Sequence, residues 1–188
     1  GQWSIISGAG GSFTGGSGNP SNSSISNPTF SGVAGTAYVL RWTISNSPCT
    51  ASTDDVNVTF NQNPTLANAG PDQTGAPTCG LTTVTLAANT PSIGTGSWSI
   101  VSGAGGSFSN AASETSDFSG VAGTAYVLRW TIDNAPCVSS TDDVAVTFNQ
   151  DPTVSNAGPD QTGAATCGLT TVTMAANTAT IGTGAWTI

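Results

Sequence analysis

Four cysteines are the residues of this chain with the most specific chemistry, and they come in two pairs of equal spacing. Cys49 and Cys137 are 88 positions apart, and so are Cys79 and Cys167. Zinc binding is disfavoured because the sequence has no histidine and no Cys-x-x-Cys pair. We therefore expect these cysteines to form disulfide bonds, as regularly spaced cysteines do in extracellular proteins.

The residues alone leave two disulfide connectivities open. Cys79 precedes a predicted strand at one end of its folded unit, whereas Cys137 follows a strand and lies at the other end. A strand of eight residues spans about 26 Å, and a disulfide needs Cα atoms within about 7 Å. Cys79 therefore pairs with Cys137 only if segment 75–80 returns along the unit. Alternatively, the Cys79-type cysteine pairs with the Cys137-type cysteine of the following unit, and pairings of Cys49 with Cys79 or of Cys137 with Cys167 are disfavoured.

Four aspartates form the second candidate site, because carboxylate oxygens are preferred ligands of Ca²⁺. Asp142 and Asp143 are adjacent, Asp72 begins the same unit, and Asp133 lies in a predicted turn. If these loops converge at one end of the unit, the four carboxylates could hold a calcium ion. The simpler interpretation is that Asp142 and Asp143 open a strand with solvated side chains and that Asp72 makes a turn hydrogen bond.

Catalysis is disfavoured by what the sequence lacks. Without histidine or lysine, a serine nucleophile has no evident base, and proton transfer would fall to carboxylates or tyrosine. The glycine-rich segments 7–13 and 102–108 lack the lysine that follows in a phosphate-binding loop. We predict that the chain is not an enzyme and that it binds no cofactor other than, at most, calcium.

The charge balance narrows the classes of partner. The chain has 2 Lys+Arg against 10 Asp+Glu, a net charge of −8, and only 6% charged residues. Phosphate binding requires clustered cations, so nucleic acid is disfavoured, as is an anionic membrane surface. No apolar run approaches the ~20 residues of a membrane-spanning helix.

A long internal repeat indicates the strands and turns that position these residues. "SGVAGTAYVLRWTI" at 31–44 recurs at 119–132, and 56 of the 70 residues of 31–100 are identical in 119–188. Pro, Asn and Gly between strand-like runs indicate junctions near residues 63 and 151. The sequence thus predicts three parts: the C-terminal part of one repeat (1–63), one complete repeat (64–151) and the N-terminal part of the next (152–188). We expect the chain to be a segment of a longer array of such repeats.

Alternating apolar and polar residues predict strands in each repeat. In "TAYVLRWTI" (124–132), Tyr126, Leu128, Trp130 and Ile132 share one face, and "TTVTLAAN" (82–89) and "DDVAVTF" (142–148) alternate in the same way. Turn clusters rich in glycine and proline separate the strands. The predicted fold is all-β, with small β-sandwich repeats in tandem that form an extended array.

The order of these motifs carries a resemblance to a known family. "NAGPDQT", then "CG…TVTLAA", "GTAYVLRWTI" and "PC…STDDVAVTF" resembles the PKD-like and other immunoglobulin-like repeats of giant surface adhesins of Bacteroidota. The resemblance implies cell adhesion or gliding motility, export by the type IX secretion system, and an extracellular location on the bacterial cell surface. The aspartate-rich "DPDG"-type loop of PKD domains is replaced here by "NTPSIGTGSW" (89–98), so metal binding through that loop does not carry over.

Two functions follow as expectations. The first is a structural repeat in the shaft of a long adhesin or filament, with neighbouring copies of the same repeat as partners. The alternative is a multivalent module that binds glycans or external surfaces, for which the seven extra residues within 14–29 are the best place.

Overall fold

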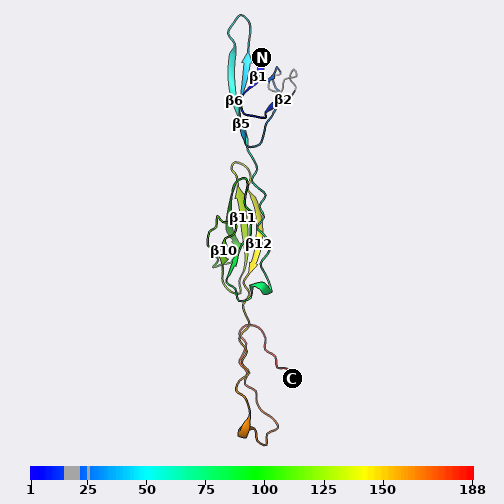
Figure 1. Ribbon diagram of the computed structural model, residues 1–188, viewed down its shortest axis with the longest axis vertical. Coiled ribbons are helices and arrows are strands. Elements are labelled where there is room, and N and C mark those ends of the chain that lie inside the picture. Colours follow the sequence, from blue (N-terminus) through cyan, green and yellow to red (C-terminus); the bar gives the residue numbers. More distant parts are fainter. Residues whose placement is uncertain (15–21, 25) are drawn as a thin grey trace. The chain divides into compact units, whose positions relative to one another are not determined.

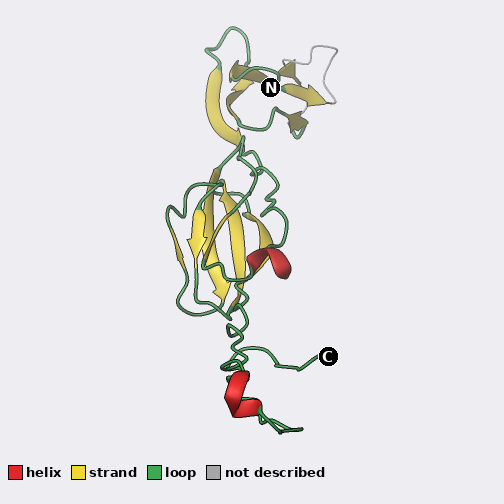
Figure 2. Ribbon diagram, turned by 60° about the horizontal axis from the view of Figure 1, so that its bottom comes forward, coloured by secondary structure: helices red, strands yellow, loops and turns green. Residues whose placement is uncertain are grey.

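The computed structural model describes residues 1–14, 22–24 and 26–188, and it confirms the all-β prediction. Among these residues the only helical segments are two short 3₁₀ turns, η1 (Ala76–Thr78) and η2 (Gly163–Thr166), which are red in Figure 2. Much of the insertion within 14–29, where we expect a lengthened loop, lies outside the described residues.

The chain forms two compact units, each made of several segments. The first comprises Gly1–Leu66, Pro91–Thr95 and Ile132–Ser140, and the second Ala67–Thr90, Gly96–Thr131 and Thr141–Ile188. This partition differs from the predicted division into 1–63, 64–151 and 152–188, which stays a prediction.

In the N-terminal part of the chain, two long antiparallel strands carry the sheet. The strands are β1 (Gln2–Ser7), β2 (Ser12–Thr14), β3 (Asn22–Ser23), β4 (Thr29–Ser31), β5 (Thr36–Ile44) and β6 (Ser52–Phe60). They form a sheet of order β3-β1-β5-β6 and a separate β2-β4 pair. β5 and β6 pair along their whole length, with Thr36 opposite Phe60 and Ile44 opposite Ser52. The repeated "GTAYVLRWTI" phrase is therefore the central strand that the alternation predicts.

Residues 64–151 contain two three-stranded sheets. The strands of these sheets are β7 (Thr83–Thr85), β8 (Thr95–Ser102), β9 (Ser107–Phe108), β10 (Asp117–Ser119), β11 (Ala125–Asp133) and β12 (Ser140–Thr147). β12-β11-β8 form one sheet and β7-β10-β9 the other, and Figure 1 labels β10, β11 and β12. The strand predicted over 82–89 is regular only at Thr83–Thr85, because Leu86 and Ala88 donate their amides to the loop residues Ser116 and Glu114 instead.

An aromatic cluster fills the space between the two sheets. Phe118 of β10 lies 5.0 Å from Tyr126 of β11 between ring centroids, and Trp98 of β8 lies 5.1 Å from Trp130. The predicted face of β11 is confirmed, since all four of its members are at most 2% exposed: Tyr126, Leu128, Trp130 and Ile132. On β12 the alternate residues Val144 and Val146 are buried in the same way.

Residues 152–188, all of which the structure describes, contain η2 but no strand. Positions that are buried in residues 64–151 are open here: Trp98 is 4% exposed, whereas the matching Trp186 is 57% exposed. The matching pair Leu86 and Met174 is 1% and 52% exposed.

Candidate functional site

Cys137 lies in the turn between β11 and β12. Its backbone N–H donates to the oxygen of Asn134 over 3.0 Å, and Cys49 makes the same bond to Asn46 over 2.8 Å in the turn between β5 and β6. Both thiols are free, with Cys49 exposed and Cys137 partly buried. The Asn134 side chain donates from Nδ2 to the backbone oxygen of Gln62, 2.6 Å away, within the first compact unit. The turn that carries Cys137 is thus bonded to the last residues before position 64.

Cys79 lies immediately after η1 and beside the end of β12. It forms an isolated parallel bridge with Asn149, and the following Gly80 donates its amide to the Asn149 oxygen over 2.9 Å. The Asn149 side chain also donates from Nδ2 to the oxygen of Gly75 (2.8 Å) and to Oγ1 of Thr78 (3.0 Å). These bonds fix η1 and Cys79 to the residues just beyond β12.

The chain reaches that position by running alongside β12 in the same direction. At the start of the strand, Ala69 donates its amide to Oδ2 of Asp142 over 2.8 Å. Further along, Gln73 donates to the oxygen of Ala145 over 2.8 Å. Cys79 then arrives at Asn149, so the eight residues of β12, about 26 Å, separate it from the turn of Cys137. A disulfide requires Cα atoms within about 7 Å, so this path disfavours pairing of Cys79 with Cys137 in one repeat, and the connectivity stays a prediction.

The four predicted calcium ligands are bonded to protein groups rather than gathered around a common point. Asp142 accepts from Ala69, and Asp72 accepts from the amide of Ala145 over 2.8 Å. Asp133 accepts from the hydroxyl of Ser139, and Asp143 accepts from Arg129. Among the described residues, no three His, Cys, Asp or Glu side chains lie close enough to hold a metal ion. The structure gives no support to a calcium site formed by Asp72, Asp133, Asp142 and Asp143, and that site stays a prediction.

Both basic side chains of the protein are bound to an aspartate on the neighbouring strand. Arg129 donates from Nε and Nη2 to the two oxygens of Asp143, at 2.7 and 2.8 Å. Arg41 and Asp55 repeat the pair at 2.6 and 2.7 Å. The hydrogen bonds from Arg129, together with its charge, lower the pKa of Asp143 against the opposing effect of partial burial. These pairs leave neither guanidinium free to recruit an anionic partner.

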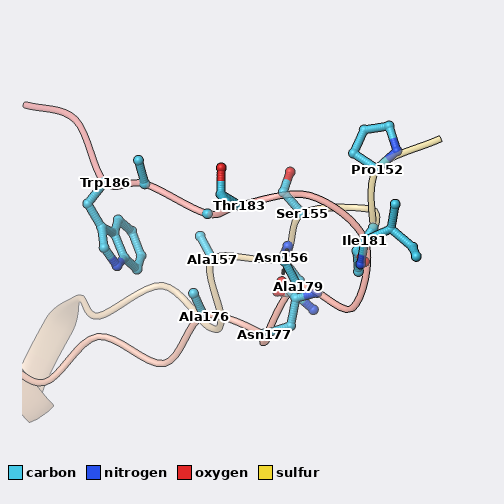
Figure 3. A pocket seen from close by; sticks show the side chains of 13 residues that line it. Pro152, Ser155, Asn156, Ala157, Ala176, Asn177, Ala179, Ile181, Thr183 and Trp186 are labelled. Carbon is cyan, nitrogen blue, oxygen red and sulfur yellow. Dashed lines mark hydrogen bonds between the residues drawn. The ribbon is translucent and has the colours of Figure 1, made fainter. Parts of the chain in front are cut away.

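Residues between Pro152 and Trp186 line an open pocket of about 480 Å³. In Figure 3, Trp186 and Ile181 lie at opposite ends of this pocket, with Asn156 and Asn177 between them. In residues 64–151, the matching Trp98 instead packs against Trp130 and donates from Nε1 to the oxygen of Ser113 over 3.1 Å.

Sequence reasoning missed the two asparagines that organise the cysteine positions, Asn134 and Asn149. Their signal was present, since "FNQ" recurs at 60–62 and 148–150 and Asn46 matches Asn134. A repeated asparagine is nonetheless equally compatible with an ordinary turn, so its bonding to a distant segment required the fold.

Comparison with protein-family models found none that matches, and comparison with curated proteins found no relative. No helix within the described residues is long and apolar enough to cross a membrane.

Proposed function

We propose that this chain is a segment of the shaft of a long bacterial surface adhesin or filament, exposed outside the cell and built from stacked immunoglobulin-like repeats. The repeat with 56 of 70 identical residues supports this proposal, because a chain that performs one reaction has no need of near-identical copies. The resemblance to type IX-secreted gliding and adhesion proteins of Bacteroidota supports the extracellular location.

The observation that carries the proposal is the path of the chain through residues 64–151. At its entry, Thr65 donates its amide to the oxygen of Ile93, two residues before β8, close to the point where β11 ends at Asp133. At its exit, Asn149 lies just beyond β12, whose last residue is Thr147. Entry and exit are thus at opposite ends of the β11–β12 pair, so repeats joined by short connections add length rather than width.

The proposal implies neighbouring copies of the same repeat as partners. Residues 152–188 match the front of residues 64–151 in sequence, and residues 1–63 match their back. The same apolar core positions therefore recur from repeat to repeat, as stacked modules require.

Glycan binding is the weaker proposal for the complete repeat. Sugar recognition commonly uses exposed aromatic rings, but Trp98 and Trp130 are 4% and 1% exposed and belong to the core. A surface with few charges and many hydroxyl and amide groups instead suits a shaft whose contacts do not depend on salt.

Fusions of the whole chain test the proposal. Joining Thr183 of one copy to Gly1 of the next rebuilds the Thr95–Gly96 step, because Gly1 and Gly184 both match Gly96. Small-angle scattering of one-, two- and three-copy fusions under reducing conditions should give a maximum dimension that grows linearly. Each added repeat should contribute at least about 26 Å, the length of an eight-residue strand. A maximum dimension that grows only as the cube root of mass, as for compact globules, would overturn the shaft proposal.

A further inference from the structure

We propose that successive repeats are joined by a disulfide between the Cys79-type cysteine of one repeat and the Cys137-type cysteine of the next. This inference rests on the stacking of repeats proposed above and adds the covalent chemistry of the joint. It assigns a function to all four thiols, which the structure leaves unpaired in this chain.

The first step is the position of Cys79 at the exit of its repeat. The parallel bridge with Asn149 and the two bonds from the Asn149 side chain hold Cys79 where the chain leaves β12. The thiol is exposed there, and its bridge partner Asn149 is three residues before Pro152, where the next part begins. Cys167 follows η2 with the same local geometry, since its amide bonds to Ala164 over 3.3 Å as that of Cys79 bonds to Ala76 over 3.2 Å.

The second step is what the Cys137 turn touches. Asn134, three residues before Cys137, donates to Gln62, and "FNQ" at 60–62 matches "FNQ" at 148–150. Gln62 therefore matches Gln150. Gln150 directly follows Asn149, the residue that bridges to Cys79. The turn with the Cys137-type cysteine therefore contacts the preceding repeat at the residue that matches Gln150. That residue follows the counterpart of Asn149, beside which the Cys79-type cysteine of the preceding repeat lies.

The chemistry is oxidation of two thiols to one disulfide. Two S–H bonds break and one S–S bond forms, with release of two protons and two electrons. A small-molecule or protein disulfide, such as oxidised glutathione, accepts the electrons and is reduced to two thiols through a mixed disulfide. Along an array, such bonds link each repeat covalently to the next and involve no residue of the hydrophobic core.

The pairing makes a specific prediction for the two-copy fusion joined at Thr183. Cys79 of the first copy should pair with Cys49 of the second, and Cys167 of the first with Cys137 of the second. The two copies are identical in sequence, so each predicted pair is tested in a fusion of its own. That fusion keeps the two cysteines of the pair and has serine at every other cysteine position. A matched control keeps Cys79 and Cys137 of the same copy.

After equilibration with a glutathione redox couple, intact mass and thiol alkylation report the oxidation state. The two fusions with cysteines on successive repeats should lose two hydrogens and become resistant to alkylation. Their ratio of disulfide to dithiol should exceed that of the same-repeat control by about tenfold or more, because the joint raises the effective concentration of the thiols.

Near-UV circular dichroism of the buried tryptophans verifies that each fusion is folded. Free thiols in both successive-repeat fusions, in folded protein whose scattering already shows an extended array, would overturn the disulfide but not the shaft. Oxidation of the same-repeat control to the same extent would also overturn it. Loss of the extended array under reducing conditions would instead count against the proposed function itself.

Discussion

The hydroxyl of Tyr126 donates a hydrogen bond to the backbone oxygen of Ala104, 2.8 Å away. The same hydroxyl accepts the amide of Val121 over 2.9 Å, so one side chain fixes two glycine-rich corners of the repeat. Tyr38 makes the equivalent bonds to Ala9 and Val33.

Tyr126→Phe should destabilise the protein by about 1–3 kcal/mol, because it leaves a partly buried N–H and a carbonyl without their partner. Chemical denaturation followed by tryptophan fluorescence measures this loss. The ring itself is retained, so the near-UV spectrum of the folded state should be unchanged. A free energy of unfolding equal to that of the native sequence would show that the two corners are held by other contacts.

Leu128→Ala should cost about 2–5 kcal/mol, since Leu128 is fully buried between the sheets and its truncation leaves a cavity. Val138→Ala is the matched control on the same chain, because Val138 is 90% exposed. Its effect should stay within about 0.5 kcal/mol. Similar midpoints for the two variants in denaturant would contradict the burial of the β11 face.

Gly96→Ala should be strongly destabilising, because the added methyl group would overlap the indole of Trp130. Gly184→Ala, the matching change in residues 152–188, should be neutral in the isolated chain because nothing lies within 4 Å of the added Cβ. In the two-copy fusion joined at Thr183, Gly1 of the second copy takes the place of Gly184. Gly1→Ala in that copy should be destabilising, because the added Cβ would overlap the indole of Trp42. Thermal unfolding of the four proteins provides the comparison.

The Arg129–Asp143 pair predicts a modest dependence of stability on pH. The pKa of Asp143 is lowered in the folded state, so the pair stabilises the fold above the unfolded pKa of about 3.9 and is lost as pH falls through the folded value. Asp143→Asn should lower stability slightly at pH 7 and have no effect near pH 2. Because both side chains are more than one third exposed, added salt should weaken the difference. An equal effect at both pH values would exclude the ion pair as its cause.

Asn149→Ala should loosen the segment that carries Cys79 without unfolding the sandwich. The substitution removes the bonds from Nδ2 to Gly75 and Thr78 but leaves the backbone bridge in place. Hydrogen exchange at Thr78, Cys79 and Gly80 should become faster, whereas exchange at β11 should not change. Asn61→Ala, at the matching position of the N-terminal part, is the control and should leave exchange at these amides unaltered.

Sequence reasoning predicted the strand cores because alternation is a local signal. Tyr126 and Trp130 fall on one face of β11 whatever the strand packs against, and the pattern of β12 is equally plain. The carboxylates behaved differently: Asp142 and Asp72 accept hydrogen bonds from residues 73 positions away. Spacing along the chain holds no information about such partners, so the same residues could be taken for calcium ligands.

The cysteines illustrate the same limit. The strand length already placed Cys79 and Cys137 far apart unless segment 75–80 turned back. Only the hydrogen bonds of Ala69, Gln73 and Gly80 along β12 show that the segment runs forward to the end of the strand. The path of segment 75–80 is set by long-range pairing rather than by local propensity.

The placement of the arginines has a consequence for resistance to proteolysis. Enzymes of the trypsin type cut only after lysine or arginine, and this chain offers them Arg41 and Arg129 alone, each in the middle of a nine-residue strand. Since proteolysis requires a locally opened backbone, neither bond is accessible until the central strand of its sheet is pulled away. A material made of such segments would persist among digestive enzymes of that class for as long as its sheets stay closed.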